Sequence, residues 1–133
     1  MCNNNVDCSC FSRIIERIIT LQQQGDTFND FGCDRPFLGN TLNNLGLNTR
    51  PITFYSCTGD QFIFPYTLNG TAGTSGVFRV ENLDECCCRC RVLAPNPDTT
   101  ATNPYVSTDD FFTINLKCIS SIKCLGDVLI TGL

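Results

Sequence analysis

Cysteine constrains this chain more than any other residue type, because eleven of its 133 residues are cysteines. This share, about eight per cent, approaches the composition of small scaffolds held together by disulfides. Because eleven is odd, at least one thiol must stay free, bind a ligand or pair with another chain. Spacing alone leaves the pairing open, so every cysteine is a candidate for a disulfide or a cross-link: Cys2, Cys8, Cys10, Cys33, Cys57, Cys86, Cys87, Cys88, Cys90, Cys118 and Cys124.

The absence of histidine removes most common catalytic arrangements. Without it the chain cannot build Ser-His-Asp or Cys-His catalysis, and it has no imidazole metal ligand. Nine basic against thirteen acidic residues give a net charge of −4, so the clustered cations that nucleic-acid binding requires are lacking. We therefore expect a non-enzyme with no catalytic residue, no cofactor, no metal and no nucleic-acid partner. Only 17% of the residues are charged, a balance that favours association.

The first residues do not form a secretory signal, because they lack a basic start and because Arg13, Glu16 and Arg17 interrupt the apolar stretch. Nothing approaches about eighteen uninterrupted apolar residues, so no membrane insertion is expected. The high cysteine content conflicts with the lack of a secretory signal, because disulfides normally form in oxidising compartments outside the cytoplasm. Either a signal has been removed, or the protein leaves its reducing compartment by another route.

One segment has helical periodicity. Between Ser12 and Gln24 isoleucines and a leucine recur every three or four residues, and Gly25 follows as a stop signal. The polar arm ahead of it, with Cys2, Cys8 and Cys10, is expected to keep its thiols accessible. Residues 25–50 are interpreted as a long loop with apolar anchors.

Beyond Pro51 the hydrophobic period changes to two, which predicts short strands. Strands are expected over residues 52–57, 61–64, 77–80, 86–93, 112–118 and 127–131, with 68–76 as a loop and 94–110 as a polar excursion. This pattern predicts a mainly β, single-domain antiparallel β-sandwich or flattened barrel with one N-terminal α-helix. Residues 1–32 would form the cysteine-bearing arm and the amphipathic helix, and residues 33–133 the β-sandwich core.

The cluster Cys86-Cys87-Cys88-Arg89-Cys90 contains a Cys-x-x-Cys spacing, which is typical of redox pairs and zinc knuckles. On a strand, however, Cys87 and Cys90 would project from opposite faces. A thiol-redox or zinc-binding protein therefore remains the alternative function, beside buried apolar thiols and disulfides. A third reading is a secreted, monomeric, disulfide-rich binding module.

Three other groups have simpler structural interpretations. Arg79, Arg89 and Arg91 are expected to pair with nearby acids and not to form a basic patch. Asp109 and Asp110 are expected to be solvated turn residues. The ten phenylalanines are expected to fill a core.

Four segments, in this order and with this approximate spacing, resemble the spore coat protein family of CotY, CotZ and ExsY from endospore-forming bacilli. They are CDRPFLG (33–39), NTRPITFYSCTGDQFIFPY (48–66), VFRVENLDECCCRCRVL (77–93) and FTINLKCISSIKCLGDVLI (112–130). The resemblance covers roughly three-quarters of the chain, so this sequence can be compared with the family segment by segment at the level of helices and strands. Family members carry a further cysteine where this chain has Ser120, so a disulfide map cannot be transferred.

The resemblance implies a structural protein of the spore surface, in the outer coat, crust or exosporium, that self-associates into a cysteine-cross-linked two-dimensional lattice. It also implies synthesis in the mother-cell cytoplasm without a signal peptide and oxidation after deposition, which resolves the conflict over the missing signal. We expect a ring of copies, six by analogy with the family. Disulfides from Cys2, Cys8 or Cys10 would reach cysteines of a partner chain, and other spore coat proteins are further candidate partners.

Overall fold

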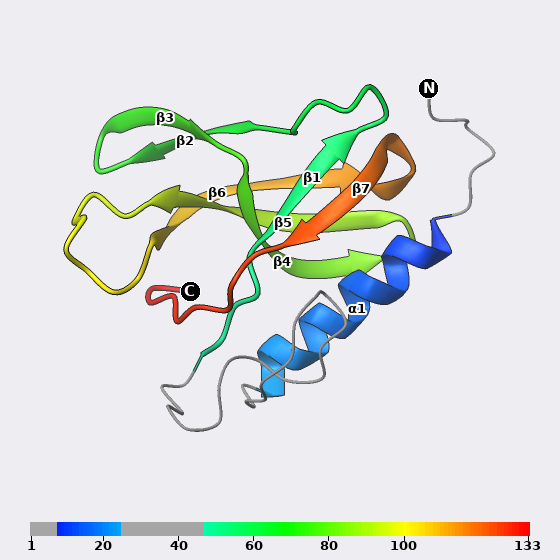
Figure 1. Cartoon of the computed structure of the whole chain (residues 1–133), viewed down its shortest axis with the longest axis horizontal. Helices are drawn as coiled ribbons and strands as arrows, with labels where there is room; N and C mark the ends of the chain where they lie inside the picture. Colours follow the sequence, from blue (N-terminus) through cyan, green and yellow to red (C-terminus); the bar gives the residue numbers. More distant parts are fainter. Residues whose placement is uncertain (1–7, 25–46) are drawn as a thin grey trace.

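The computed structural model describes residues 8–24 and 47–133 and places one helix and seven strands within them. The elements are α1 (Ser9–Gln24), β1 (Ile52–Ser56), β2 (Phe64–Leu68), β3 (Thr71–Ser75), β4 (Val77–Asp84), β5 (Cys87–Pro95), β6 (Tyr105–Asn115) and β7 (Ile119–Cys124). Five strands form an antiparallel sheet in the order β6-β5-β4-β1-β7, and β2 pairs with β3 in a second sheet (Figure 1). The predicted mainly β sandwich with an N-terminal helix is confirmed. The proposed boundary between residues 32 and 33 lies outside the described residues.

One hydrophobic core joins the two sheets and the helix. The face of β4 and β5 that carries Phe78, Val80, Cys88 and Cys90 is fully buried. The Phe112 ring packs between the sheets, with its centroid 4.7 Å from that of Phe64 and 4.8 Å from that of Phe78. These contacts confirm a core function for these phenylalanines. Such pairs add about 1 kcal/mol each beyond the apolar area that they bury.

The helix begins at Ser9, three residues earlier than the apolar period indicated, and Phe11 in this first turn packs against the core. Ile15 and Ile18 are completely buried in the core that α1 shares with β4. Gln22 then fixes the far end of the helix. Its amide donates to the carbonyl of Val80 at 3.0 Å and accepts from the backbone NH of Arg50 at 3.1 Å.

The prediction of a loop over residues 68–76 is wrong, since β2 and β3 form a hairpin there. Asn69 and Gly70 connect the strands with φ angles of 52° and 82°. Positive φ at both central positions is the geometry that an Asn-Gly pair favours and that matches the twist of antiparallel strands. Glycine and threonine content concealed this hairpin, although the Asn-Gly signal was present.

Further predicted segments are wrong in extent. The predicted strand at 127–131 contributes only a bridge between Thr49 and Val128. In the predicted strand at 61–64, Gln61 forms only a bridge with Tyr55, and Phe64 is already the first residue of β2. The polar excursion is shorter than expected, because β6 already begins at Tyr105. A 3₁₀ turn from Leu116 to Cys118 ends β6, with the Asn115 side chain accepting from the backbone NH of Lys117. Most of the predicted loop over residues 25–50 lies outside the described residues.

Asp110 has a structural role and is not a turn residue. It lies in β6, and its carboxylate accepts a 2.8 Å hydrogen bond from the backbone NH of Thr67 in β2. The neighbouring Asp109 is exposed in the same strand. The bond from Thr67 links the edge of the five-stranded sheet to the two-stranded sheet.

A buried ion pair attaches the segment that follows β7 to the segment that precedes β1. Arg50 and Asp127 have 0% and 1% exposed side chains, and the two guanidinium–carboxylate distances are 3.0 and 3.3 Å. Bidentate geometry makes such a pair directional. The pair gives the C-terminal segment a fixed position without a strand.

No helix in the described residues combines the length and the hydrophobicity that crossing a bilayer requires.

Candidate functional site

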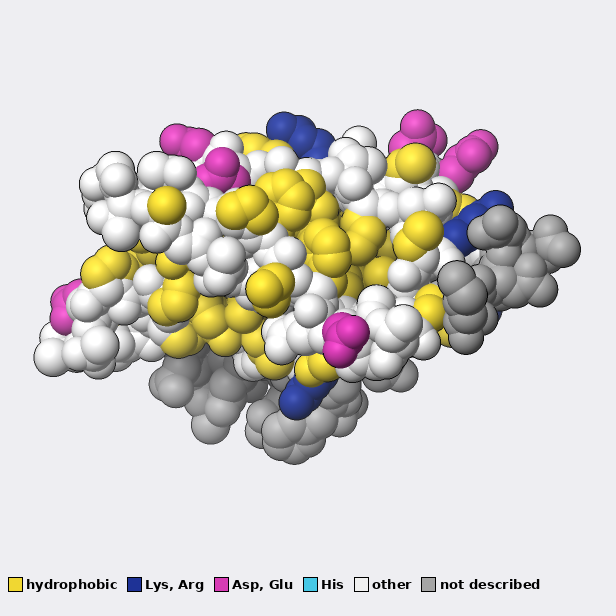
Figure 2. Space-filling model, turned by 90° about the horizontal axis from the view of Figure 1, so that it is seen from above, with side chains coloured by type: hydrophobic (Ala, Val, Ile, Leu, Met, Phe, Trp, Pro, Cys, Tyr) yellow, Lys and Arg dark blue, Asp and Glu magenta, His cyan; other side chains and the backbone are white. Residues whose placement is uncertain are grey.

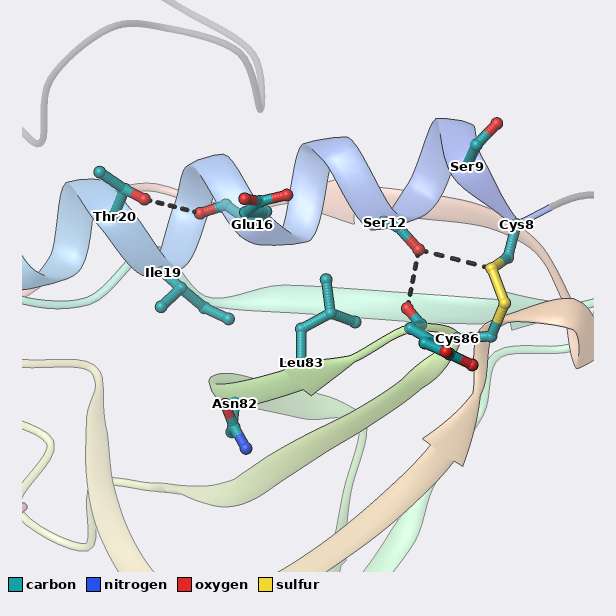
Figure 3. A pocket seen from close by; sticks show the side chains of 10 residues that line it. Cys8, Ser9, Ser12, Glu16, Ile19, Thr20, Asn82, Leu83 and Cys86 are labelled. Carbon is teal, nitrogen blue, oxygen red and sulfur yellow. Dashed lines mark hydrogen bonds between the residues drawn. A yellow bond between two sulfur atoms is a disulfide. The ribbon is translucent and has the colours of Figure 1, made fainter.

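A disulfide joins the start of α1 to the turn between β4 and β5. Cys8 and Cys86 form it, with their Cα atoms 6.0 Å apart, inside the usual range for a disulfide. Cys86 is the second residue of a two-residue turn, and Glu85, the first, has a positive φ of 54°. The disulfide closes one end of a surface groove of about 520 Å³ between α1 and the β4–β5 hairpin (Figure 3).

The structure corrects the expectation that Cys8 bonds to a partner chain. Cys8 is 6% exposed and is bonded to its own chain, because Ile15 and Ile18 anchor α1 on β4 and so bring the helix start to the hairpin turn. The polar composition of residues 2–8 suggested an open arm, but the apolar stripe of the helix determines where Cys8 lies. The prediction for Cys2 lies outside the described residues.

Three exposed, free thiols lie around this disulfide: Cys10, Cys87 and Cys118. Cys10 is in the first turn of α1, and Cys87 follows Cys86 directly. Cys118 is the last residue of the 3₁₀ turn. The first residue of that turn, Leu116, donates a 2.8 Å hydrogen bond from its backbone NH to the carbonyl of Cys86 in the hairpin. The helix start, the β4–β5 turn and the β6–β7 connection therefore meet at one end of the domain, on the right in Figure 1. We call this the thiol end.

Cys88 and Cys90 are buried neighbours on the inner face of β5. Their sulfur atoms are 3.6 Å apart, and both side chains are 0% exposed. The hydrogen bond with Cys88 and then burial raise the pKa of the Cys90 thiol well above its usual value. A thiol held in its protonated form is a poor nucleophile and a poor metal ligand.

We predict that Cys90 makes the protein less stable at alkaline pH. Below the usual thiol pKa, about 8.5, the Cys90 thiol is protonated in both the folded and the unfolded chain, and the free energy of unfolding has its full value. Above it the unfolded chain ionises first, so the free energy of unfolding should fall by about 1 kcal/mol per pH unit. Denaturant unfolding between pH 7 and 10 measures this slope. Cys90→Val should flatten it and exposed Cys118→Ser should not; equal slopes in all three proteins contradict the assignment.

The Cys-x-x-Cys spacing does not assemble a joint site. As expected, Cys87 is exposed and Cys90 is buried, because adjacent strand positions alternate between faces. Within residues 8–24 and 47–133 no group of three or more cysteine, aspartate or glutamate side chains converges in a way that could hold a metal ion.

The remaining cysteine candidates contribute less to an accessible site. Cys57, which follows β1, and Cys124, which ends β7, are both disulfide-bonded. Cys33, like Cys2, falls outside the described residues.

Arg79 and Arg91 pair with an acid as expected, whereas no ion pair of the described residues involves Arg89; Arg89 and Arg91 stack on an aromatic ring that sequence analysis missed. The Arg79 guanidinium bonds to Glu81, and Arg91 lies 3.8 Å from the same carboxylate. Arg89 and Arg91 each place a guanidinium carbon 4.4 Å from the centre of the Phe111 ring. Strand register explains this, since Phe111 is opposite Arg91 across β5 and β6, and only a correct pairing of these strands would have predicted it.

Comparison with known proteins places the chain in a family. A model of the family described as spore coat protein Z matches residues 1–127, almost the whole chain. Searches of the curated proteins and of the solved structures found no match.

Proposed function

This chain belongs to the spore coat protein Z family, and from that premise we propose that its copies join into a two-dimensional lattice cross-linked by disulfides between chains. A structural role in the spore coat follows from the family. The cross-linking is our inference, and the observation that carries it is the set of three free, exposed thiols at the thiol end.

These thiols suit contacts between copies because they lie on three different elements. Cys10 belongs to a helix, Cys87 to a hairpin strand and Cys118 to a 3₁₀ turn, so a neighbour can approach from several directions. Within a chain, one disulfide contributes on the order of 2–4 kcal/mol. Several in parallel between chains would make dissociation very slow, because one bond holds the partners together while another reopens.

The surface also offers non-covalent contacts for assembly. Figure 2 shows apolar side chains gathered along the middle of one face, with few charged groups among them. The outer strands β6 and β7 of the five-stranded sheet give further candidate contacts through their edges. If one copy uses such a surface to contact a different surface of the next copy, the contact is head-to-tail, and it closes a ring when the rotation between successive copies permits. We propose a ring of six by analogy with the family.

The proposed place of the protein is the spore surface, in the outer coat, crust or exosporium. Its proposed partners are copies of itself and other coat proteins. Synthesis in the mother-cell cytoplasm would keep the thiols reduced until deposition, and later oxidation would lock the assembly.

The alternative of a thiol-redox or zinc-binding protein has less support. It requires accessible thiolates in the Cys86–Cys90 cluster, whereas Cys86 is in a disulfide and Cys88 and Cys90 are buried. Because Cys86 is bonded and Cys88 and Cys90 are buried, Cys87 is the one exposed free thiol of that cluster.

Electron microscopy of the purified recombinant protein tests the proposed function. We expect ordered sheets that survive heating in denaturant and that dithiothreitol converts to separate rings or monomers. Non-reducing gels of the same samples should show a ladder of chains that dithiothreitol abolishes. A stable monomer without a ladder, or a ladder that dithiothreitol does not affect, contradicts the proposal.

A further inference from the structure

Two neighbouring stripes of α1 carry opposite charge and complementary sulfur chemistry. The first stripe lines the groove that the disulfide closes, where Glu16 and, from the hairpin, Glu85 lie beside Cys8 and Cys86. The second lies roughly a third of a turn around the helix. There Cys10, Arg13 and Arg17 share a separate hollow of about 240 Å³.

These four charges are available to a partner. Among the ion pairs of the described residues none involves Arg13, Arg17, Glu16 or Glu85, and all four side chains are exposed. A free thiol flanked by two cations therefore faces outward on one stripe, and a disulfide flanked by two anions on the other. A second copy of this chain is the occupant that fits, because one copy's basic thiol stripe complements its neighbour's acidic disulfide groove.

The disulfide is arranged for attack at one of its two sulfurs. Cys86 is half-buried in the turn, whereas Cys8 is 6% exposed, so Cys86 is the residue of the pair that a partner can reach more easily. Cys8 is the residue before the first helical position, and its carbonyl accepts from the backbone NH of Ser12 at 2.9 Å. The Ser12 hydroxyl lies 3.4 Å from the Cys8 sulfur (Figure 3). A helix N-terminus stabilises a thiolate, which makes Cys8 the better leaving group.

We propose that cross-linking starts by thiol–disulfide exchange, in which the Cys10 thiolate of one copy attacks the Cys86 sulfur of its neighbour. The Cys10 thiol first loses its proton to water. Its sulfur then forms a bond to Cys86 while the Cys8–Cys86 bond breaks, and the electron pair of that bond leaves on Cys8. The Cys8 thiolate at the start of α1 finally takes a proton from water.

No oxidant is needed for this step, because one S–S bond replaces another. It converts a disulfide within a chain into a disulfide between chains, and it leaves the number of free thiols unchanged. The inference deepens the proposed function and rests on it, since it names the first bond of the lattice. The contact is head-to-tail, with Cys10 of each copy meeting Cys86 of the next, which is the kind of contact that closes a ring.

Exchange without oxygen separates this route from oxidation. Recombinant monomer carrying the Cys8–Cys86 disulfide is incubated under argon, quenched with acid and analysed on non-reducing gels, with free thiols titrated in denaturant. Cross-linked species should accumulate while the thiol count per chain stays constant, and peptide mapping should find Cys10 bonded to Cys86. Cys10→Ser should slow cross-linking at least tenfold, whereas Cys88→Ala, a control that removes a free but buried thiol, should leave the rate within twofold.

Charge reversal tests the docking independently of the sulfur chemistry. Arg13→Glu/Arg17→Glu and Glu16→Arg/Glu85→Lys should each slow cross-linking about tenfold at low salt, the scale on which steering charges act. Mixing the two variants should restore the rate, because the reversed surfaces match again. A mixture no faster than either variant alone overturns the docking.

The outcomes distinguish this inference from the proposed function. Cross-links that form only in air, with two thiols lost per bond and with Cys86 absent from the linked peptides, overturn the exchange and leave the lattice standing. No cross-link under any condition overturns both.

Discussion

Replacing Cys10, Cys87 and Cys118 together by serine should abolish the covalent links between chains. Non-reducing gels of the heated variant should show monomer alone, where the wild-type chain gives a ladder. The reason is that these are the exposed free thiols of residues 8–24 and 47–133, so within that part of the chain no exposed free thiol remains at the thiol end. Because all three side chains project into solvent, the serines should change the free energy of unfolding by less than about 0.5 kcal/mol.

The matched control for this variant keeps the exposed thiols and removes the buried ones. Cys88→Ala/Cys90→Ala leaves the surface intact, so the ladder should persist, although the lost core contacts should destabilise the fold by about 2 kcal/mol. Circular dichroism shows whether each variant is folded. A ladder of wild-type intensity from the triple serine variant contradicts the assignment of cross-linking to these three thiols.

The largest effect on stability is expected from the buried ion pair. Asp127→Ala should lower the free energy of unfolding by about 3–5 kcal/mol, because it leaves the Arg50 charge without that carboxylate at a site that is completely buried. A change of this size is a large part of the stability of a small domain. Urea unfolding with reductant absent throughout, which keeps the disulfide intact, measures it.

A double replacement distinguishes the cost of removing one partner of the buried ion pair from the cost of lost packing. Arg50→Met/Asp127→Leu removes both charges and keeps much of the volume, so it should be more stable than Asp127→Ala. As an outward-facing reference, Glu81→Ala breaks a pair whose side chains are 14% and 18% exposed and should cost less. If Asp127→Ala costs no more than Glu81→Ala, the Arg50–Asp127 pair does not hold the C-terminal segment.

The fold class could be predicted from the sequence wherever a strand buries one face. The alternation around Ile114 indicated β6, and the isoleucine stripe indicated α1, because burial imposes these periods. The β2–β3 hairpin was missed since threonine, alanine and glycine give no such contrast. The C-terminal segment was overpredicted because its apolar residues pack without a strand partner, apart from the Val128 bridge.

The candidate site could be predicted only as a list of cysteines. Sequence spacing placed Cys87 and Cys90 on opposite faces correctly, since strand geometry is local. It could not pair Cys8 with Cys86, which are 78 residues apart, because that contact depends on how α1 packs on β4. The acidic groove and the basic hollow likewise exist only once the helix lies against the hairpin.

Sulfur bonds between copies can be detected directly by mixing isotopes. Equal amounts of unlabelled and ¹⁵N-labelled chain are assembled together, digested without reduction and analysed by mass spectrometry. We predict linked peptides that carry one labelled and one unlabelled partner and that contain Cys10, Cys87 or Cys118. Linked peptides that are all uniformly labelled or uniformly unlabelled would contradict the claim that disulfides hold this coat protein's copies together.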